Sequence, residues 1–509
     1  MTDFPTGLLF DDAMTLLRES AAQRRLEAEY LALPRCHGRV LAQDVDASMP
    51  LPPFDNSAMD GFAFRHVDLA GDETTLRLAG DQFAGIARNA SLQTGECMRI
   101  TTGAPMPANA DTVAIKENCR VDGTSVIVPG TTQAGANVRL AGEDVRIGDR
   151  VLGAGSVLTP ARASLAAALG LASLRVSRRP TVAVFTTGDE LVEPGMPLAP
   201  GQIYDSNRDL LMGLLRADGL EPTAWPRLPD DPRQVEIALR DAGCAFDVII
   251  TAGGVSAGEK DHLPGVLAQF GRTHFWKVKM KPGMPLLYGS LDQAQVLGLP
   301  GNPVSVLATY LTFGRALIDA LQGRQEPRQT WQAQLVAPLD KPHVRREFVR
   351  GQLSSGRNGA LQVEANAATG SHRLRAAADS NALIVVPEGA QRYAAGEVVE
   401  VTEDKMNAVT AMSGSGPAYF FLLVEQMIAA GVDMGLSPQH ARQLAAKTAL
   451  GAAKMLATSS DDPAELRRKV TSPGGTTHAA ITHMQAQNVP QAIVDAIKAA
   501  ERRGRELGS

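Results

Sequence analysis

Apolar runs alternate with amphipathic stretches between residues 180 and 325. The runs "TVAVFTT", "FDVIITAGG" and "QVLGLPG" are short and almost wholly apolar, whereas "DSNRDLLMGLLRADG" and "DPRQVEIALRDA" between them repeat apolar residues at helical spacing. Apolar strands separated by amphipathic helices are typical of a parallel sheet covered on both faces. In such sheets, ligands bind beyond the carboxyl ends of the strands. We therefore expect an α/β domain over residues 179–326, with its site at that edge.

The pattern changes on both sides of this region. Residues 8–32 have helical spacing, residues 47–147 hold short β-like runs separated by glycine and proline, and Thr159 and Pro160 predict a helix start as N-cap and first residue. Short strands return over 326–403 and predict a small β-barrel or sandwich, and alanine-rich helices follow residue 404. The predicted domains are a helical and linker domain (1–46 and 148–178), a β-rich domain (47–147), the α/β domain (179–326), a β-barrel (327–403) and an all-α domain (404–509).

Composition narrows the class of protein. With 44% hydrophobic residues, 21% charged residues and a formal net charge of -5, the chain is typical of a soluble globular protein and lacks the basic excess of nucleic-acid binders. Its four cysteines are widely spaced without a CxxC pair, which argues against a disulfide framework or a zinc site. No targeting segment and no run of 18 or more apolar residues is evident, so we expect a cytoplasmic protein with no membrane partner.

The stretch "ITAGGVSAGEKDHL" is a candidate anion site at the end of a predicted strand. Gly253 and Gly254 allow backbone N–H groups to approach an anion, and Ser256 adds a hydroxyl. Glu259 and Asp261 place carboxylates beside that site, which is favourable if a divalent metal lies between acid and anion or if one acid acts as a base. A simple strand-to-helix turn is the alternative interpretation.

Acidic residues also follow two other predicted strands of this domain. "FTTGDEL" supplies Asp189 and Glu190, and "RLPDDP" supplies Asp230 and Asp231. The carboxyl ends of parallel strands meet at one edge, so these acids favour a shared site over scattered surface charge. In the β-rich region, loops carry Asp60, Thr102 and Asp144, and nothing in composition says whether they meet the same site.

Cationic residues form a second candidate group. Lys277, Lys279 and Lys281 alternate in "KVKMKPGMP", which in an extended chain points them to one side, where they could bind an oxyanion or protect an edge strand. "GLPGNPVS" predicts a helix that starts at Asn302 or Pro303, with an N-terminus suited to an anion. The usual dinucleotide, P-loop, HExxH and GxSxG signatures are absent from the sequence.

Eight segments in this order give the chain a recognisable resemblance. They are "PPFDNSAMDGFAF", "RITTGAPMP", "AGEDV", "FTTGDEL", "GQIYDSN", "GGVSAGEKD", "KPGMP" and "GLPGNPVS". Over about residues 5–402 the chain resembles the molybdopterin molybdenumtransferase (MoeA) family, which includes the E domain of gephyrin. The resemblance implies a MogA-like parallel-sheet domain facing a β-rich domain in a dimer. It also implies a Mg²⁺-dependent transferase that takes adenylylated molybdopterin and molybdate, releases AMP and forms molybdenum cofactor.

By motif position, the resemblance also implies the site residues. The implied catalytic residues are Asp60, Thr102, Asp144, Glu190, Asp230, Asp261, Lys277 and Lys281. The implied cofactor-binding residues are Gly253, Gly254, Ser256, Pro300, Pro303, Arg350 and Ser371, and the implied Mg²⁺ ligands are Glu190, Asp261 and Asp144. One departure is "VRLAGED", which leaves only Arg139 where many family members carry consecutive arginines. Molybdopterin adenylyltransferase and molybdoenzyme maturation factors are candidate partners.

The tail resembles a different family. "AVTAMSGSGPAYFF" and "LRRKVTSPGGTTHAAITHM", within residues 404–509, are similar to the C-terminal helical domain of pyrroline-5-carboxylate reductase. In that family the domain dimerises, and the "SPGGTT" loop, here Ser472 to Thr477, holds the proline or pyrroline ring. The chain has no Rossmann domain to deliver hydride, so we expect a dimerisation bundle without reductase activity, and a homodimer or larger homo-oligomer. The rival interpretations are a non-catalytic molybdopterin-binding scaffold and a proline-metabolism module.

Overall fold

The computed structural model describes residues 4–85, 90–256, 261–356, 359–368, 370–403, 416–458, 463–472, 474–489, 491–493 and 495–496. The chain divides into two compact units, one made of residues 1–26, 179–322 and 327–509 and the other of residues 27–178 and 323–326. The predicted fold class of α/β, β-rich, β-barrel and all-α parts is confirmed.

A seven-stranded sheet forms the centre of the first unit. Its strands, in spatial order, are β1 (Thr6–Leu8), β19 (Gly271–Val278), β21 (Leu287–Leu291), β22 (Ala294–Leu299), β18 (Val248–Ala252), β14 (Val182–Thr186) and β17 (Thr223–Ala224). The strands from β22 to β17 are parallel, as expected, whereas β21 runs antiparallel to both of its neighbours because a tight turn joins it to β22. A short parallel pair, β15 (Leu191–Val192) and β16 (Ile203–Tyr204), lies outside this sheet.

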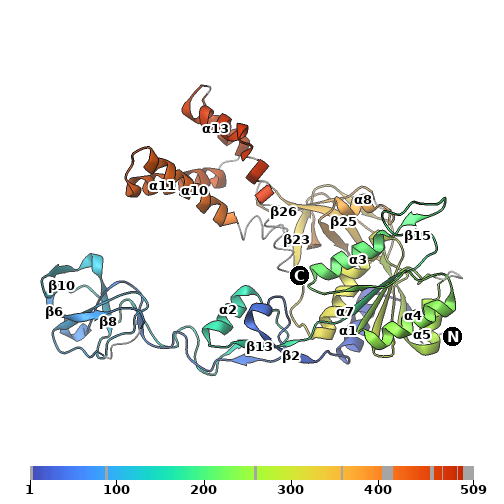
Figure 1. Cartoon of the computed structure of the whole chain (residues 1–509), viewed down its shortest axis with the longest axis horizontal. Coiled ribbons are helices and arrows are strands. Elements are labelled where there is room, and N and C mark those ends of the chain that lie inside the picture. Colours follow the sequence, from blue (N-terminus) through green and yellow to red (C-terminus); the bar gives the residue numbers. More distant parts are fainter. Residues whose placement is uncertain are drawn as a thin grey trace. The chain divides into compact units, whose positions relative to one another are not determined.

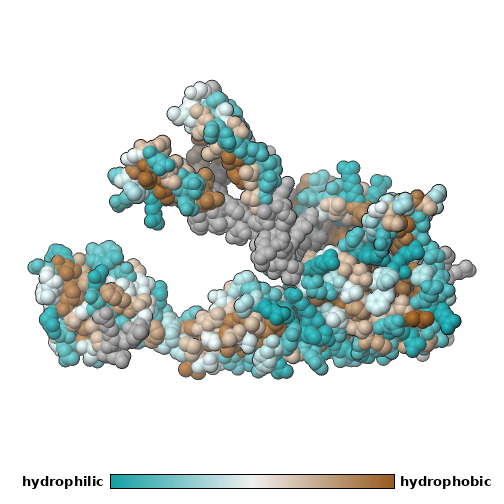
Figure 2. Space-filling model, viewed as in Figure 1, coloured by the Kyte–Doolittle hydropathy of each residue, from teal (hydrophilic) through white to brown (hydrophobic). Residues whose placement is uncertain are grey.

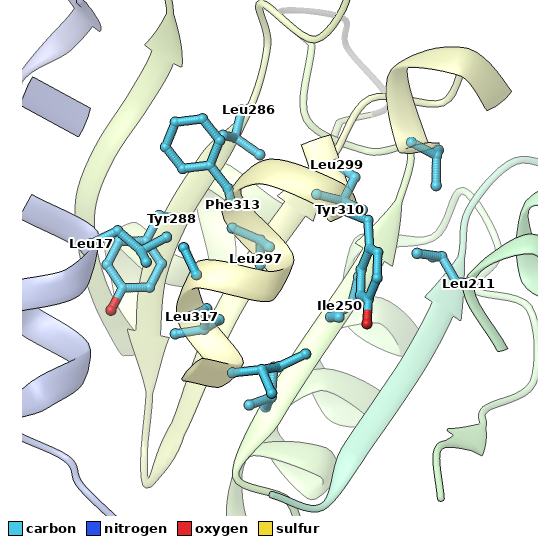
Figure 3. Close-up of a cluster of buried hydrophobic side chains, with 14 of the residues drawn as sticks. Leu17, Leu211, Ile250, Leu286, Tyr288, Leu297, Leu299, Tyr310, Phe313 and Leu317 are labelled. Carbon is cyan, nitrogen blue, oxygen red and sulfur yellow. The ribbon is translucent and has the colours of Figure 1, made fainter. Parts of the chain in front are cut away.

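Helices cover both faces of the sheet (Figure 1). One face packs against α1 (Phe10–Ala22), α3 (Ser206–Ala217), α6 (Pro303–Thr309), the π-helical turn η4 (Tyr310–Gly314) and α7 (Arg315–Gln322), and the other against α4 (Pro232–Ala245) and α5 (Leu263–Phe270). Successive residues of β14 serve the two faces in turn, because Val182 and Val184 pack on the first face and Ala183 and Phe185 on the second. Figure 3 shows part of the first core, where Phe313 lies beside Leu286, and Leu17 of α1 and Tyr288 of the sheet belong to the same cluster.

The first residues of the chain belong to this unit. The sequence predicted a domain of residues 1–46 with 148–178, whereas β1 pairs with β19 and α1 packs in the α/β core, because the apolar face of α1 (Phe10, Ala13 and Leu17) is buried there. The continuous helix Pro303–Gln322 is the one described helix long and apolar enough to span a membrane, and it is 67% buried inside the protein, as a core helix is.

Residues 330–403 form a closed five-stranded barrel. Its strands are β25 (Arg346–Ser355), β26 (Leu361–Ala365), β23 (Thr330–Leu335), β29 (Val398–Glu403) and β27 (Ala382–Val386). Pairing of β25 with β27 closes the ring, which decides between the barrel and the sandwich, and β20 (Met280–Lys281) adds to β25 from the α/β domain. The pair β24 (Leu339–Lys341) and β28 (Gln391–Tyr393), and helix α8 (Leu374–Ala378), complete this part.

The described residues of the second unit form three two-stranded pairs and a six-stranded sheet. Two of the pairs are β2 (Ala28–Ala32) with β13 (Ser173–Ser177) and β3 (Val45–Asp46) with β12 (Arg150–Leu152), beside helix α2 (Pro160–Ala168). Thr159 caps α2 by accepting a hydrogen bond from the Arg162 N–H, as predicted. The six-stranded sheet, in spatial order, is β8 (Thr112–Ile115), β5 (Gly61–Phe64), β7 (Glu96–Ile100), β6 (Glu73–Gln82), β10 (Ser125–Pro129) and β9 (Arg120–Asp122), and β4 (Asn56–Ser57) pairs with β11 (Val138–Arg139). The short 3₁₀ turns are η1 (Leu33–Arg35), η2 (His66–Asp68) and η3 (Lys116–Asn118).

The tail is helical. Its described helices are α10 (Gly416–Asp433), α11 (Pro438–Thr458), α12 (Pro463–Lys469) and α13 (Thr476–Ala486), of which α10 and α11 pack together. Leu422, Leu423, Leu444 and Leu450 are exposed, and Figure 2 shows apolar surface along these helices. The last predicted helix, over 489–507, lies mostly outside the described residues.

Candidate functional site

The carboxyl ends of β14, β18 and β22 meet at one edge of the seven-stranded sheet. These strands are parallel neighbours in register, so the loops that follow them start side by side. The Gly253 N–H donates to the Leu299 carbonyl at 2.9 Å, and the Asn207 side-chain amide donates to the Gly301 carbonyl at 2.7 Å. The structure therefore brings together the predicted glycine turn, the "LPGNP" loop and the start of α3.

The glycine turn requires glycine for two reasons. Gly253 and Gly254 have φ angles of 98° and 74°, which residues with a Cβ rarely adopt. A Cβ on Gly253 would also lie 2.5 Å from the Thr187 Oγ1 atom of the loop after β14. The backbone of the turn thus lies against the neighbouring loop, with Ser256 exposed after it and Glu259 outside the described residues.

Carboxylates gather at the same edge. Glu190 reaches back toward Gly188, where an added Cβ would lie 2.5 Å from the Glu190 carboxylate, and the Asp230 N–H donates to Asp189 Oδ1 at 3.3 Å. Asp231 is the N-cap of α4, and its carboxylate accepts a hydrogen bond from the Gln234 N–H. Of this acid pair, Asp230 is the one that is not a helix cap. Predicted acids after β14 and before α4 therefore lie together, and Asp261 lies just before α5.

Arg227 holds the acidic loop in place and was not predicted. Its Nη1 donates to the backbone carbonyls of Gly188, Asp189 and Leu191 at 3.1, 2.9 and 2.9 Å. An arginine that binds only backbone carbonyls leaves no periodic or motif signal, so the sequence pattern could not single it out.

Asp205 and Asn207 were also missed, although both lie in the quoted segment "GQIYDSN". Asp205 is buried, caps α3 and accepts a 2.6 Å hydrogen bond from Thr186 Oγ1. Asn207 is buried as well, and its Oδ1 has no hydrogen-bond partner among the described residues; the same holds for His262 Nε2. Buried polar atoms are normally satisfied, so these two atoms mark a place at this edge where a bound ligand or water would supply the hydrogen bond that the described residues do not. In the sequence, the order Asp-Ser-Asn directly before a helical repeat indicates an aspartate N-cap followed by an asparagine in the first turn. This pattern could have pointed to Asp205 and Asn207.

A second group of predicted residues shares a cavity of about 410 Å³ between the α/β domain and the barrel. Lys281, Arg350 and Ser371 all line it, together with Arg345, Glu347 and Asn366. Arg350 is buried, and its guanidinium donates to the carbonyls of Ala368, Gly370 and Arg373, which fixes the loop that carries Ser371. Burial lowers the pKa of Arg350.

Lys281, which lines this cavity, is paired with a carboxylate of the barrel. Its Nζ lies 2.8 Å from Glu347 Oε1, and its side chain is 37% exposed. The helix start at Asn302 and Pro303 is confirmed, but the Val304 N–H already donates to the Ser371 carbonyl at 3.2 Å, so that helix end is partly satisfied within the protein.

The three lysines do not form the predicted row. Lys277 has a φ of 66°, which breaks the extended geometry and its two-residue period at the end of β19. The Lys277 ammonium lies over the Trp276 ring, 4.9 Å from its centroid, whereas Lys281 lines the cavity and Lys277 does not. The prediction of a single lysine face is therefore wrong.

The predicted residues of the second unit are considered within that unit. Asp60 accepts hydrogen bonds from the Thr102 N–H at 2.8 Å and the Thr102 hydroxyl at 2.9 Å. These bonds, with smaller help from Lys116, hold the pKa of the Asp60 carboxyl below its ordinary value. Asp144 and Arg139 are both exposed.

No cluster of three or more histidine, cysteine, aspartate or glutamate side chains that could hold a metal occurs in the described part of the chain. Carboxylate oxygens are nevertheless the ligands that Mg²⁺ prefers, and Mg²⁺ is usually held by one or two carboxylates together with substrate phosphates. Glu190 and Asp261 therefore fit that role chemically, since both lie in loops at the edge that carries the glycine turn.

Four family models match the chain. They are "MoeA N-terminal region (domain I and II)" over residues 8–170, "Probable molybdopterin binding domain" over 183–320, "MoeA C-terminal region (domain IV)" over 332–403 and "Pyrroline-5-carboxylate reductase dimerisation" over 403–507.

Similar proteins agree with the first three matches. The molybdopterin molybdenumtransferase of Haemophilus influenzae is 38% identical over 379 residues, which are 74% of this chain and 93% of that protein. Molybdopterin molybdenumtransferase 2 of Mycobacterium tuberculosis is 39% identical over 380 residues, 72% of this chain and 93% of that protein. The crystal structure of the molybdopterin biosynthesis moeA protein from Pyrococcus horikoshii has a TM-score of 0.68 and 27% identity, and covers 78% of this chain and 100% of that one. The chain belongs to the molybdopterin molybdenumtransferase family, and carries in addition a C-terminal domain of the reductase dimerisation type.

Proposed function

We propose that the chain is a molybdopterin molybdenumtransferase that takes adenylylated molybdopterin and molybdate, releases AMP and forms molybdenum cofactor. The observation that carries this proposal is the pairing of two features within one unit. A glycine turn lies at the carboxyl edge of parallel strands, and a cationic cavity lies between the α/β domain and the barrel.

The glycine turn is suited to the phosphate end of the pterin substrate. Gly253 and Gly254 expose backbone without a Cβ, and parallel-sheet edges are where α/β domains bind ligands. The orphan atoms of Asn207 and His262 offer an acceptor and, depending on tautomer, a donor to the same ligand. Pro300 and Pro303 shape the adjacent loop, and Ser256 adds an exposed hydroxyl.

The cationic cavity is suited to molybdate. A tetrahedral dianion needs concentrated positive charge and hydrogen-bond donors, which Lys281, Arg350 and Ser371 supply from three different segments. Lys277, at the end of β19, would add long-range attraction rather than a contact inside this cavity.

Hydrolysis of the adenylate is assigned to the carboxylates. We assign Glu190 and Asp261 to holding Mg²⁺, which when bound would neutralise charge on the phosphoanhydride. For Asp144, in the second unit, a metal-binding role follows from the family resemblance alone. Asp230 is assigned to orienting water beside the acidic loop that Arg227 fixes. For Asp60 and Thr102, which pair within the second unit, a catalytic role follows from the family resemblance alone. The low pKa of Asp60 keeps that carboxylate ionised at neutral pH.

The tail is proposed to act in assembly. Its match to a dimerisation domain and its exposed leucines favour a homodimer or a larger homo-oligomer. Thr477, at the start of α13, matches the reductase's active-site threonine, but hydride transfer would need a Rossmann domain, which the matched regions do not include. We place the protein in the cytoplasm, with molybdopterin adenylyltransferase and molybdoenzyme maturation factors as candidate partners.

Binding measurements on two variants test the two halves of the site separately. Gly253→Val is expected to lose molybdopterin binding while retaining molybdate binding, and Lys281→Ala is expected to show the reverse. Retention of both ligands by both variants, measured by calorimetry on folded full-length protein, would contradict the assignment of the two ligands.

A further inference from the structure

His343 is a half-buried imidazole that the proposed reaction does not use. It lies in the loop between β24 and β25, and its side chain is 20% exposed. Both ring nitrogens are buried without a hydrogen-bond partner among the described residues. Buried polar atoms rarely lack a hydrogen-bond partner. His343 does not line the 410 Å³ cavity, so a ligand in that cavity would not supply this partner directly.

Glu347 connects this imidazole to the cavity. The Glu347 side chain is buried, and its two oxygens face different partners. Oε1 lies 2.8 Å from the Lys281 ammonium, which lines the cavity, and Oε2 lies 3.0 Å from His343 Nε2, outside hydrogen-bond geometry. One carboxylate thus stands between a cation that an oxyanion can reach and an imidazole that it cannot.

Burial and the neighbouring cations favour the neutral form of His343. Burial is the largest cause that lowers the pKa of His343, and Lys281, Arg345 and Lys341 lower it further, whereas Glu347 opposes them. The Lys341 ammonium is held by the carbonyls of Pro387 and Gly389. Farther out, Arg346 is paired with Asp11 and Glu388.

We propose that His343 is a proton-linked positioning residue for the oxyanion site: when molybdate enters the cavity and draws the Lys281 ammonium from Glu347, His343 takes up one proton from solvent and replaces Lys281 as the partner of Glu347. This inference rests on the proposed assignment of molybdate to the cavity. The geometry carries it, because His343 Nε2 already lies 3.0 Å from Glu347 Oε2, so that a proton and a small rotation of the ring form a hydrogen-bonded ion pair.

The consequence is a linkage between pH and oxyanion affinity. A lower pH favours the imidazolium, which engages Glu347 and leaves Lys281 to the anion, so affinity rises as pH falls. Where one full proton is taken up per molybdate, affinity changes by about ten-fold per pH unit. The window lies between the lowered pKa of His343 in the empty site and its higher pKa with the anion bound.

Calorimetry of sodium molybdate binding to the full-length protein tests this directly. The heat is measured in two buffers of different ionisation enthalpy, at several pH values between about 6.5 and 8. The lower end of this range is the ordinary imidazole pKa. We expect the native protein to take up about half to one proton per molybdate near the lower end and less near the upper end. Binding by the native protein without proton uptake at any pH would overturn the inference and leave the proposed function intact.

Two variants assign the proton. His343→Gln keeps a polar side chain of similar size, and we expect it to bind molybdate with no proton uptake and less than about a two-fold change in affinity across the range. The matched control is His274→Gln, because His274 on β19 is also a half-buried imidazole whose pKa burial lowers, and it does not line the cavity. It should behave as the native protein does.

Proton uptake by His343→Gln equal to that of the native protein would overturn the assignment to His343.

Glu347→Gln provides a second test of the same assignment. The substitution removes the carboxylate that binds Lys281, so we expect tighter molybdate binding at about pH 8 and no proton uptake. Absence of molybdate binding in the native protein would remove the oxyanion site itself, and with it both the inference and that half of the proposed function.

Discussion

At the scale of single residues, Gly253 shows how a small detail fixes the site. Its φ of 98° and the nearby Thr187 hydroxyl both exclude a side chain. The turn can lie against the loop after β14 only because the Cβ is missing, and this closeness brings the two loops into one site.

Gly253→Ala is therefore expected to lower the free energy of unfolding by about 1–3 kcal/mol through backbone strain, and to weaken molybdopterin binding at least ten-fold. Chemical denaturation and ligand titration check both values. Gly265→Ala is the matched control, because an added Cβ there meets nothing within 4 Å and the position lies inside helix α5. A Gly253→Ala protein as stable and as competent as the control would refute the role of the turn.

The Asp60–Thr102 pair gives a prediction on pH. Thr102→Val removes the hydroxyl that helps to lower the Asp60 pKa, so that pKa should move up toward its ordinary value. A carboxyl whose folded-state pKa is lowered stabilises the fold above its unfolded-state pKa, and this contribution is lost as pH falls through the folded-state pKa. Titration of the Asp60 carboxyl by NMR measures the shift, and an unchanged pKa in Thr102→Val would contradict the assignment.

The sequence identified the site residues that belong to a motif, but it missed residues that act by holding another residue in place. The sequence pattern and motifs pointed to Gly253, Gly254 and Glu190, because glycine and acid at strand ends have a direct chemical meaning. Arg227 and Glu347 escaped, since each acts through a partner that lies near only in the folded chain. The prediction of a lysine row was wrong because Lys277 has a left-handed backbone conformation, which interrupts the two-residue period of the strand. The alternation of residues in the sequence gives no sign of this interruption.

At the scale of elements, a buried ion cluster ties helices together. Asp218, just after α3, accepts from the Tyr310 hydroxyl at 2.7 Å and from Arg315 Nε at 2.9 Å, and lies 3.0 Å from Arg328 Nη1. Burial alone would raise the pKa of Asp218, but Arg315 and Arg328 outweigh it and lower that pKa. The cluster joins α3, η4, α7 and the entry to the barrel.

Asp218→Asn should cost about 3 kcal/mol in the free energy of unfolding, because it removes the carboxylate that Arg315 and Arg328 share, although Arg328 keeps its ion pair with Asp319. Asp379→Asn is the control, since the Arg375–Asp379 pair is exposed and should contribute less than about 1 kcal/mol. Thermal and denaturant unfolding would measure both, and similar losses in the two variants would argue against the cluster as a structural joint.

Helices with clear apolar periodicity were predicted correctly, whereas the strands and helices that neighbour one another in the fold were predicted only in part. Helices α3 and α4 lie where the apolar spacing of their segments predicted them, and α2 starts after Thr159, its predicted cap. The antiparallel β21 and the addition of β1 and α1 to the sheet depend on contacts between distant segments, which local pattern does not encode.

At the scale of the whole molecule, the chain carries a C-terminal domain of the reductase dimerisation type in addition to the regions of a family enzyme, and the proposed assembly through this domain can be tested. Leu444, exposed on α11, is suited to contact with a second copy. Leu444→Asp is expected to reduce the mass of the oligomer in light scattering without changing the rate of AMP release. Gln443→Asp, an exposed neighbour, controls for the added charge. An unchanged mass in Leu444→Asp would count against a tail-mediated assembly through this surface.

The central claim is that one chain couples adenylate hydrolysis to molybdenum insertion. A single-turnover reaction of full-length protein with adenylylated molybdopterin, molybdate and Mg²⁺, scored for AMP and for bound molybdenum together, tests it most directly. The account predicts both products from the native protein and neither from Asp60→Ala or Glu190→Ala. A folded, pterin-binding protein that yields neither AMP nor cofactor would contradict the claim and indicate a molybdopterin-binding scaffold instead.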